Sequence, residues 1–126
     1  MIEAMPFAAR LGVDLVAAEA DEVRATLDWS PDLCTAGGVL HGGALMALAD
    51  SAGAICAYLN LPEGAQTSTI ESKTNFFRAV REGRVEAVAR PVHVGRTTIV
   101  VQTELAAADG RRVALVVQTQ AVLGES

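Results

Sequence analysis

Residues 42–60 place the strongest constraint on what this chain can fold into. The large apolar residues of this segment recur at helical spacing and form one stripe, consisting of Leu45, Leu48, Ala49, Ala52, Ile55, Cys56 and Leu59. The opposite side carries small or thin side chains around a single charge, Asp50. A helix that is apolar or small on every side is typical of a buried helix. We therefore expect residues 42–60 to form a long helix in the middle of the protein.

The rest of the chain has the pattern of β-strands. In residues 22–29 the odd positions are apolar and the even positions are polar, which predicts a half-buried strand. Residues 13–18, 66–77, 84–94, 97–107 and 112–123 also have strand character. The connections at 81–83, 95–96 and 109–110 are short, which requires antiparallel neighbours. A change in apolar parity around Pro91 predicts a bulge there.

One long helix among about six antiparallel strands predicts an α+β fold, with a curved sheet wrapped around the helix. The chain has 126 residues, of which 51% are hydrophobic, so residues 1–126 are expected to form a single domain with one core. A single sheet cannot cover both faces of the helix. We therefore expect the small-residue face to pack on a second copy of the chain in a twofold dimer.

Charge and cysteine usage exclude several classes of partner. The formal net charge is −5, Lys73 is the only lysine and the arginines are scattered, so no nucleic-acid partner is expected. Residues 33–61 imitate a membrane span, but their glycines and the charge of Asp50 argue against a membrane partner. Cys34 and Cys56 lack metal-ligand spacing and are expected to be small buried hydrophobes in a reducing cytoplasm. No targeting peptide is recognised at the start, so we predict a cytoplasmic protein.

The glycine-rich segment 37–43 leads directly into the predicted helix. Glycines there let the backbone approach a ligand closely, and the first N–H groups of a helix have no partner within it. Such N–H groups can bind an anion or a developing oxyanion. The alternative is that these glycines only permit a tight turn into the helix.

Asp50 is the second candidate, because no lysine or arginine lies within four residues of it. Such a carboxylate can cap a buried group or serve as a base. Gly42 and Asp50 are eight residues apart, which corresponds to about 12 Å along a helix. One substrate carbonyl cannot contact both groups of one chain, since each contact spans about 3 Å. Two antiparallel copies of the helix would instead place Gly42 of one chain beside Asp50 of the other.

The residues that carry a family resemblance lie in this region and just beyond it. The run His41-Gly42-Gly43-Ala44 continues to Leu48-Ala49-Asp50, and Thr69-Ile70-Glu71 and Asn75-Phe76-Phe77-Arg78 follow. This pattern resembles the HGGxxxxLAD motif of hotdog-fold acyl-CoA thioesterases, in particular the phenylacetyl-CoA thioesterase (PaaI-like) branch. The resemblance spans nearly the whole chain.

The resemblance implies a role for several residues. Asp50 would activate water or attack the thioester, and the N–H of Gly42 would polarise its carbonyl. A Ser or Thr on the next strand would assist; Thr69 fits best, and the neighbouring Ser68 would point to the opposite face of that strand. His41 is either a donor that faces the thioester or a structural residue at the start of the helix.

The substrate-binding residues are less well defined by the resemblance. Many relatives carry an asparagine where this chain has Thr35, which leaves open the group that orients His41 or the thioester. Gly43 belongs to the same turn as Gly42. Among five arginines that could meet the phosphates of coenzyme A, Arg96 is the preferred candidate because it follows Gly95 in a tight turn.

The predicted activity is hydrolysis of an acyl-CoA to a free acid and coenzyme A. This chemistry needs a base or nucleophile and an oxyanion donor, so we expect no metal and no cofactor apart from the coenzyme A of the substrate. An aryl-acetyl or a medium-chain acyl group would suit the predicted pocket. The alternatives are a non-catalytic acyl-CoA-binding protein and a hotdog hydratase or dehydratase. The resemblance also implies a homo-oligomer, either a dimer or a tetramer.

Overall fold

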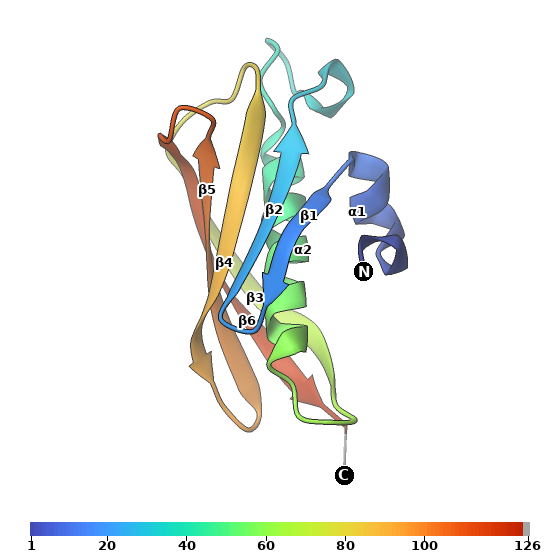
Figure 1. The fold of residues 1–126 in the computed structure, drawn as a ribbon. Coiled ribbons are helices and arrows are strands. Elements are labelled where there is room, and N and C mark those ends of the chain that lie inside the picture. Colours follow the sequence, from blue (N-terminus) through green and yellow to red (C-terminus); the bar gives the residue numbers. More distant parts are fainter. Residues whose placement is uncertain (125–126) are drawn as a thin grey trace.

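Six antiparallel strands form one curved sheet, and a single long helix lies along its inner face (Figure 1). This computed structural model describes residues 1–124. The spatial order of the strands is β1-β2-β4-β5-β6-β3, so β1 and β3 are the two edges. The elements are β1 (Asp14–Glu19), β2 (Glu22–Asp28), α2 (Gly42–Leu59), β3 (Gln66–Phe76), β4 (Arg84–Val94), β5 (Thr98–Ala107) and β6 (Arg112–Leu123). The predicted α+β hotdog architecture is confirmed.

Strand alternation places the core between the sheet and α2. The central strands β2, β4, β5 and β6 bury every second residue against the helix, including Val23, Val85, Leu105 and Val116. The helix contributes Leu48, Ala49, Ala52 and Cys56, none of which is accessible to solvent. The predicted bulge is also present, since the register between β4 and β5 shifts between Pro91 and His93.

The ends of α2 are held by side chains. At its start His41 is the N-cap residue, and its Nδ1 accepts a hydrogen bond of 2.7 Å from the N–H of Gly43. At its end Asn60 donates to the carbonyl oxygens of Cys56 and Ala20. The cap stabilises the first turn of α2, and the bond to Ala20 ties the end of the helix to the turn between β1 and β2.

Two short helices at the start of the chain were not predicted. They are η1 (Ile2–Ala4) and α1 (Pro6–Leu11), and they lie beside α2 on the β1 side of the molecule (Figure 1). Pro6 stands at the first helical position, and Gly12 ends the helix with φ 90°. A proline at the first helical position and a glycine at the end are recognised helix boundary signals, so the sequence could have indicated α1.

One face of α2 is open to solvent within a single chain. Asp50, Met46 and Tyr58 are exposed on it, and Ala47 and Ala54 are partly exposed. One sheet and α1 cover only part of the circumference of α2, as expected from the sequence, and burial of the open face against a second copy of the chain stays a prediction. By length and hydropathy α2 could also cross a membrane, although half of it is buried inside the protein and core helices share these properties.

Candidate active site

The loop before α2 brings the glycine-rich segment to the start of the helix. Gly37 and Gly38 adopt φ of 85° and 77°, a conformation that favours glycine. An isolated bridge between Cys34 and Leu40 closes the loop. The N–H of Gly42, the first residue of α2, has no hydrogen-bond partner within residues 1–124. This N–H is therefore a free donor at the positive end of the helix dipole.

The neighbouring candidates have different environments. The N–H of Gly43 is used by His41 Nδ1, so it is not a free donor in this conformation. Thr35 is exposed in the loop, where its own N–H donates to the carbonyl of Val39 at 2.8 Å. The ring of Phe76, from the end of β3, lies so close to Gly42 that a Cβ there would be 3.1 Å from Phe76 Cζ.

Asp50 lies in the middle of α2, on its open face. Its Oδ1 accepts two hydrogen bonds, one of 3.1 Å from Thr69 Oγ1 and one of 3.2 Å from Gln118 Nε2. No ion pair within residues 1–124 includes this carboxylate. Asp50 is thus an exposed carboxylate oriented by two neutral donors from the sheet, which leaves its negative charge uncompensated by any basic side chain.

The two neighbouring hydroxyls on β3 face opposite sides of the sheet. Thr69 points to the helix and donates to Asp50, and Ser68 is exposed on the other face. The register between β3 and β6 shifts between Thr69 and Glu71, so Ile70 is an extra residue at this point. Strand alternation in the sequence did not predict this bulge. As a result Thr69 ends the first run of helix-facing residues on β3.

Two buried glutamines on β6 were also missed. Gln118 and Gln120 occupy helix-facing positions and have no accessible surface. Gln118 contacts Asp50, and Gln120 Nε2 donates to Thr69 Oγ1 at 2.7 Å. The available signal was the polar run 118–120 inside an otherwise apolar strand, where the core-facing alternation calls for aliphatic side chains.

The structure does not bring all the predicted residues of one chain together. His41 and Gly42 are at the start of α2, two helical turns from Asp50, a separation of about 12 Å along the axis. Arg96 lies in the turn between β4 and β5, at the end of the molecule where α2 ends (Figure 1). There Arg96 lines a hollow of about 360 Å³ together with Pro62 and Glu63.

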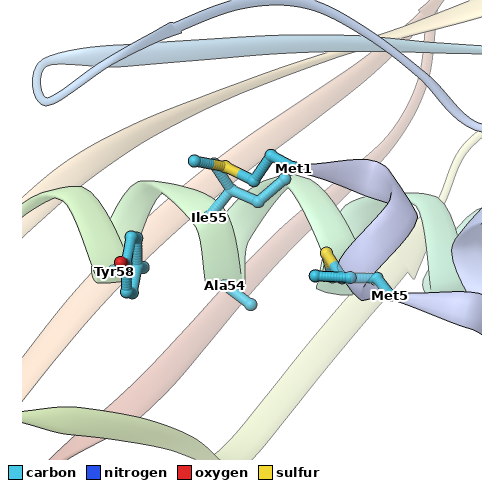
Figure 2. A pocket seen from close by; sticks show the side chains of 6 residues that line it. Met1, Met5, Ala54, Ile55 and Tyr58 are labelled. Carbon is cyan, nitrogen blue, oxygen red and sulfur yellow. The ribbon is translucent and has the colours of Figure 1, made fainter.

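An apolar hollow opens beside the exposed face of α2, one helical turn beyond Asp50. Its volume is about 340 Å³, and Figure 2 shows Met1 and Met5 from the start of the chain beside Ala54, Ile55 and Tyr58 of α2. The hollow lies between the first residues of the chain and α2. Its wall is almost entirely hydrocarbon, which suits an apolar ligand group.

The Cys56 thiol is not a candidate for nucleophilic catalysis. Burial raises the pKa of the Cys56 thiol to about 11, with a smaller contribution from the charge of Asp21, so this thiol stays protonated at neutral pH. Cys34 is only half-buried, contrary to the prediction for it, because it lies in the loop before α2. Its Sγ donates to the carbonyl of Ser30 at 3.3 Å.

Sequence comparison decides the family. The sequence profile of the thioesterase superfamily matches residues 37–114, which include the start of α2, Asp50 and Thr69. The chain belongs to the thioesterase superfamily. The hotdog thioesterase resemblance is thereby confirmed, and the phenylacetyl-CoA branch within it stays a prediction.

Individual relatives of this thioesterase-superfamily chain support the same assignment. The thioesterase PA1618 of Pseudomonas aeruginosa is 40% identical over 87 residues, which are 68% of this chain and 60% of that protein. The 1,4-dihydroxy-2-naphthoyl-CoA hydrolase of Escherichia coli is 39% identical over 74 residues, which are 59% of this chain and 54% of that protein. The chain thus aligns with less than two thirds of the length of either relative.

Solved structures extend the likeness over almost the whole chain. A thioesterase from Haemophilus influenzae has a TM-score of 0.89 and 30% identity, over 94% of this chain and 82% of that one. A mutant form of thioesterase PA1618 has a TM-score of 0.88 and 33% identity, over 93% of this chain and 85% of that one. These matches agree with the six-stranded sheet around one helix, and they support thioester hydrolysis as the general chemistry of the family.

Proposed function

We propose that this chain is an acyl-CoA thioesterase with Asp50 as its base or nucleophile. The observation that carries the proposal is the Asp50 carboxylate, exposed on α2 and oriented by Thr69 and Gln118 from two strands. A carboxylate with no basic partner keeps its capacity to accept a proton or to attack a carbonyl carbon. Thioesterase names among the relatives support the same chemistry.

Two routes lead from this carboxylate to products. In the first, Asp50 takes a proton from water while the hydroxyl oxygen bonds to the thioester carbon. The C–S bond then breaks, and the proton passes to the sulfur of coenzyme A. In the second, Asp50 attacks the carbon, the C–S bond breaks and the thiolate takes a proton from solvent; water then hydrolyses the resulting anhydride. Both routes place negative charge on the carbonyl oxygen, which the N–H of Gly42 would stabilise.

The oxyanion donor is proposed to come from a second copy of the chain. Gly42 and Asp50 of one chain are separated by about 12 Å along α2. The open face of α2 carries the small residues Gly43, Ala47 and Ala54 around Asp50, which would allow close approach of a second α2. The neighbouring edge strand β3 exposes Ile70 and Phe76. An antiparallel dimer across this face would bring Gly42 of each chain to Asp50 of the other.

The remaining parts of the substrate have proposed sites as well. The apolar hollow between the first residues and α2 begins one turn from Asp50, so we assign it to the acyl group, of aryl-acetyl or medium-chain size. The exposed guanidinium of Arg96 is assigned to a phosphate of coenzyme A. We propose no metal and no redox cofactor in the reaction.

The test is the release of free thiol from a panel of acyl-CoA substrates, measured colorimetrically for the wild type and for Asp50→Asn. The amide has the shape of the carboxylate but cannot accept the proton or attack the carbon, so we expect kcat to fall by at least about 100-fold. Substrate binding and oligomeric state should be unchanged. A variant that retains more than about a tenth of the wild-type kcat would remove Asp50 from this role.

The same panel separates the alternatives. A non-catalytic acyl-CoA-binding protein would bind substrate without releasing thiol. A hydratase would add water to an enoyl-CoA and leave the thioester intact. Thiol release that depends on Asp50 contradicts both alternatives.

A further inference from the structure

Gln118 and Gln120 are unusual residues for the helix-facing side of a central strand. Both are inaccessible to solvent, and their neighbours on the same face of β6 are aliphatic, such as Val116 and Val122. Burying an amide group without partners is unfavourable, so an amide at this position calls for a compensating role. The partners of the two side chains indicate what that role is.

Only the amide nitrogen of Gln118 has a hydrogen-bond partner within residues 1–124. Its Nε2 donates to Asp50 Oδ1 at 3.2 Å, but its Oε1 has no hydrogen-bond partner within residues 1–124. The unpaired oxygen lies against Gly53 of α2, where a Cβ would be 2.5 Å from Gln118 Cδ and closer still to Oε1. Glycine at position 53 is therefore what allows this side chain to reach Asp50.

Gln120 orients the second donor to Asp50. Thr67 Oγ1 lies 3.1 Å from Gln120 Oε1, and Gln120 Nε2 donates to Thr69 Oγ1 at 2.7 Å. Because Thr69 Oγ1 accepts this bond, its own hydrogen is free to point at Asp50 Oδ1, 3.1 Å away. Donors from β3 and β6 are thus directed from the interior of the sheet toward one carboxylate oxygen.

Both donors reach the same oxygen of Asp50. No hydrogen bond within residues 1–124 uses Oδ2. We propose that Gln118 is a positioning residue which, together with Thr69, holds Oδ1 and presents Oδ2 to the water or thioester carbon. This inference rests on the proposed thioesterase function and deepens it, because it assigns the reacting atom and the group that aims it. The orientation of Oδ2 is important because a small displacement of a reacting group lowers the reaction rate by a large factor.

The first test is Gln118→Met, which removes the amide but keeps an unbranched side chain of similar length. We expect kcat to fall about 10-fold with KM little changed, because the reacting oxygen loses its orientation. The melting temperature should stay the same or rise, because the change removes a buried oxygen that has no partner.

Thr103→Val is the matched control. Thr103 lies on the neighbouring strand β5, is inaccessible to solvent and has an unpaired Oγ1, but it has no hydrogen bond to Asp50. This variant also replaces a buried polar group by an apolar one. It should keep or raise the melting temperature like Gln118→Met, while kcat and KM stay those of the wild type.

A second variant, at Gly53 of α2, tests the same contact between Gln118 and Asp50. Gly53→Ala changes no hydrogen-bonding group but displaces the Gln118 amide, so it should lower kcat in the same way. In a Gln118→Ala background, where the displaced amide is absent, adding Gly53→Ala should cause no further loss. This non-additivity is specific to a shared contact. It also keeps the proposal testable if Gln118→Met does not fold.

The outcomes separate this proposal from the proposed function. If Asp50→Asn is inactive but Gln118→Met and Gly53→Ala both keep the wild-type kcat, the positioning role is overturned and the thioesterase function stands. If Gln118→Met and Thr103→Val lower kcat equally, the effect is one of packing and the positioning role is again overturned. Full thiol release by Asp50→Asn, or none by the wild type, would overturn both proposals.

Discussion

At the residue scale, one carboxylate and its two donors account for the proposed chemistry. Asp50 comes from the helix, Thr69 from the edge strand and Gln118 from the neighbouring strand β6. Each donor supplies a single neutral hydrogen bond, whereas Asp50 is proposed to take part in bond making. We therefore expect substitution of Asp50 to lower kcat far more than substitution of either donor does.

Thr69→Ala tests this grading. The change removes one donor to Asp50, so kcat should fall by less than it does in Asp50→Asn, on the order of 10-fold, a factor that corresponds to about 1.4 kcal/mol. Ser68→Ala is the matched control on the same strand, and it should be nearly silent because Ser68 is exposed on the opposite face. Thiol-release kinetics for the two variants provide the measurement. A larger effect at Ser68 would mean that the strand alternation at the Ile70 bulge is assigned to the wrong face.

At the element scale, α2 carries both groups of the proposed reaction, the N–H of Gly42 and the carboxylate of Asp50. The stability of its first turn depends on the N-cap residue His41. The ring of His41 accepts from the N–H of Gly43, which stabilises the first turn that also presents the N–H of Gly42. The two roles predicted for His41 can be distinguished because asparagine also caps helices well but lacks an imidazole.

His41→Ala should lower stability by about 1 kcal/mol, the usual cost of losing an N-cap, and His41→Asn should restore it. We expect the capping role to dominate, so that His41→Asn also keeps most of the wild-type kcat. Chemical denaturation and thiol release, measured on both variants, check these expectations. Full stability combined with a severe loss of turnover in His41→Asn would instead assign His41 to contact with the thioester.

At the scale of the whole molecule, the central question is whether one chain makes a complete site. Gly42 at the start of α2 and Asp50 in its middle are too far apart to act on one carbonyl. The open face of α2 and the exposed edge strand β3 are the surfaces that would complete the site in a dimer. Subunit complementation tests this arrangement directly.

Gly42→Pro removes the N–H, and the residue before it already has the extended backbone that a following proline requires, with φ −62° and ψ 136° at His41. Gly42→Pro and Asp50→Asn should each fold and be nearly inactive alone. After co-refolding in equal amounts, half of the dimers are mixed and each contains one intact site, so about one quarter of the sites should recover. Thiol release before and after mixing is the measurement.

Gly42→Ala is the control for this experiment, because it adds a Cβ near Phe76 but keeps the N–H. It should retain activity as a homodimer. Absence of recovery in mixed dimers that native mass spectrometry confirms would rule out the shared site and leave Gly42 as a turn residue.

Local patterns in the sequence were sufficient for most of the architecture. Helical spacing predicted residues 42–60, and the structure has α2 at Gly42–Leu59. Alternation predicted the bounds of β4 and β6, and the parity change at Pro91 predicted the bulge on β4. These features depend on contacts made every two, three or four residues along the chain, so a local pattern records them.

The spatial arrangement around Asp50 was decided only by the tertiary structure. The sequence pointed to Asp50 and Thr69, but Gln118 is 68 residues from Asp50 and reaches it only because β6 pairs with β3 beneath α2. The Ile70 bulge likewise exists only relative to the register of β6. Alternation tells which face of a strand is buried, but not which distant side chain lies opposite. The amide at position 118 therefore acquires its partner, and its proposed role, only when the sheet closes around the helix.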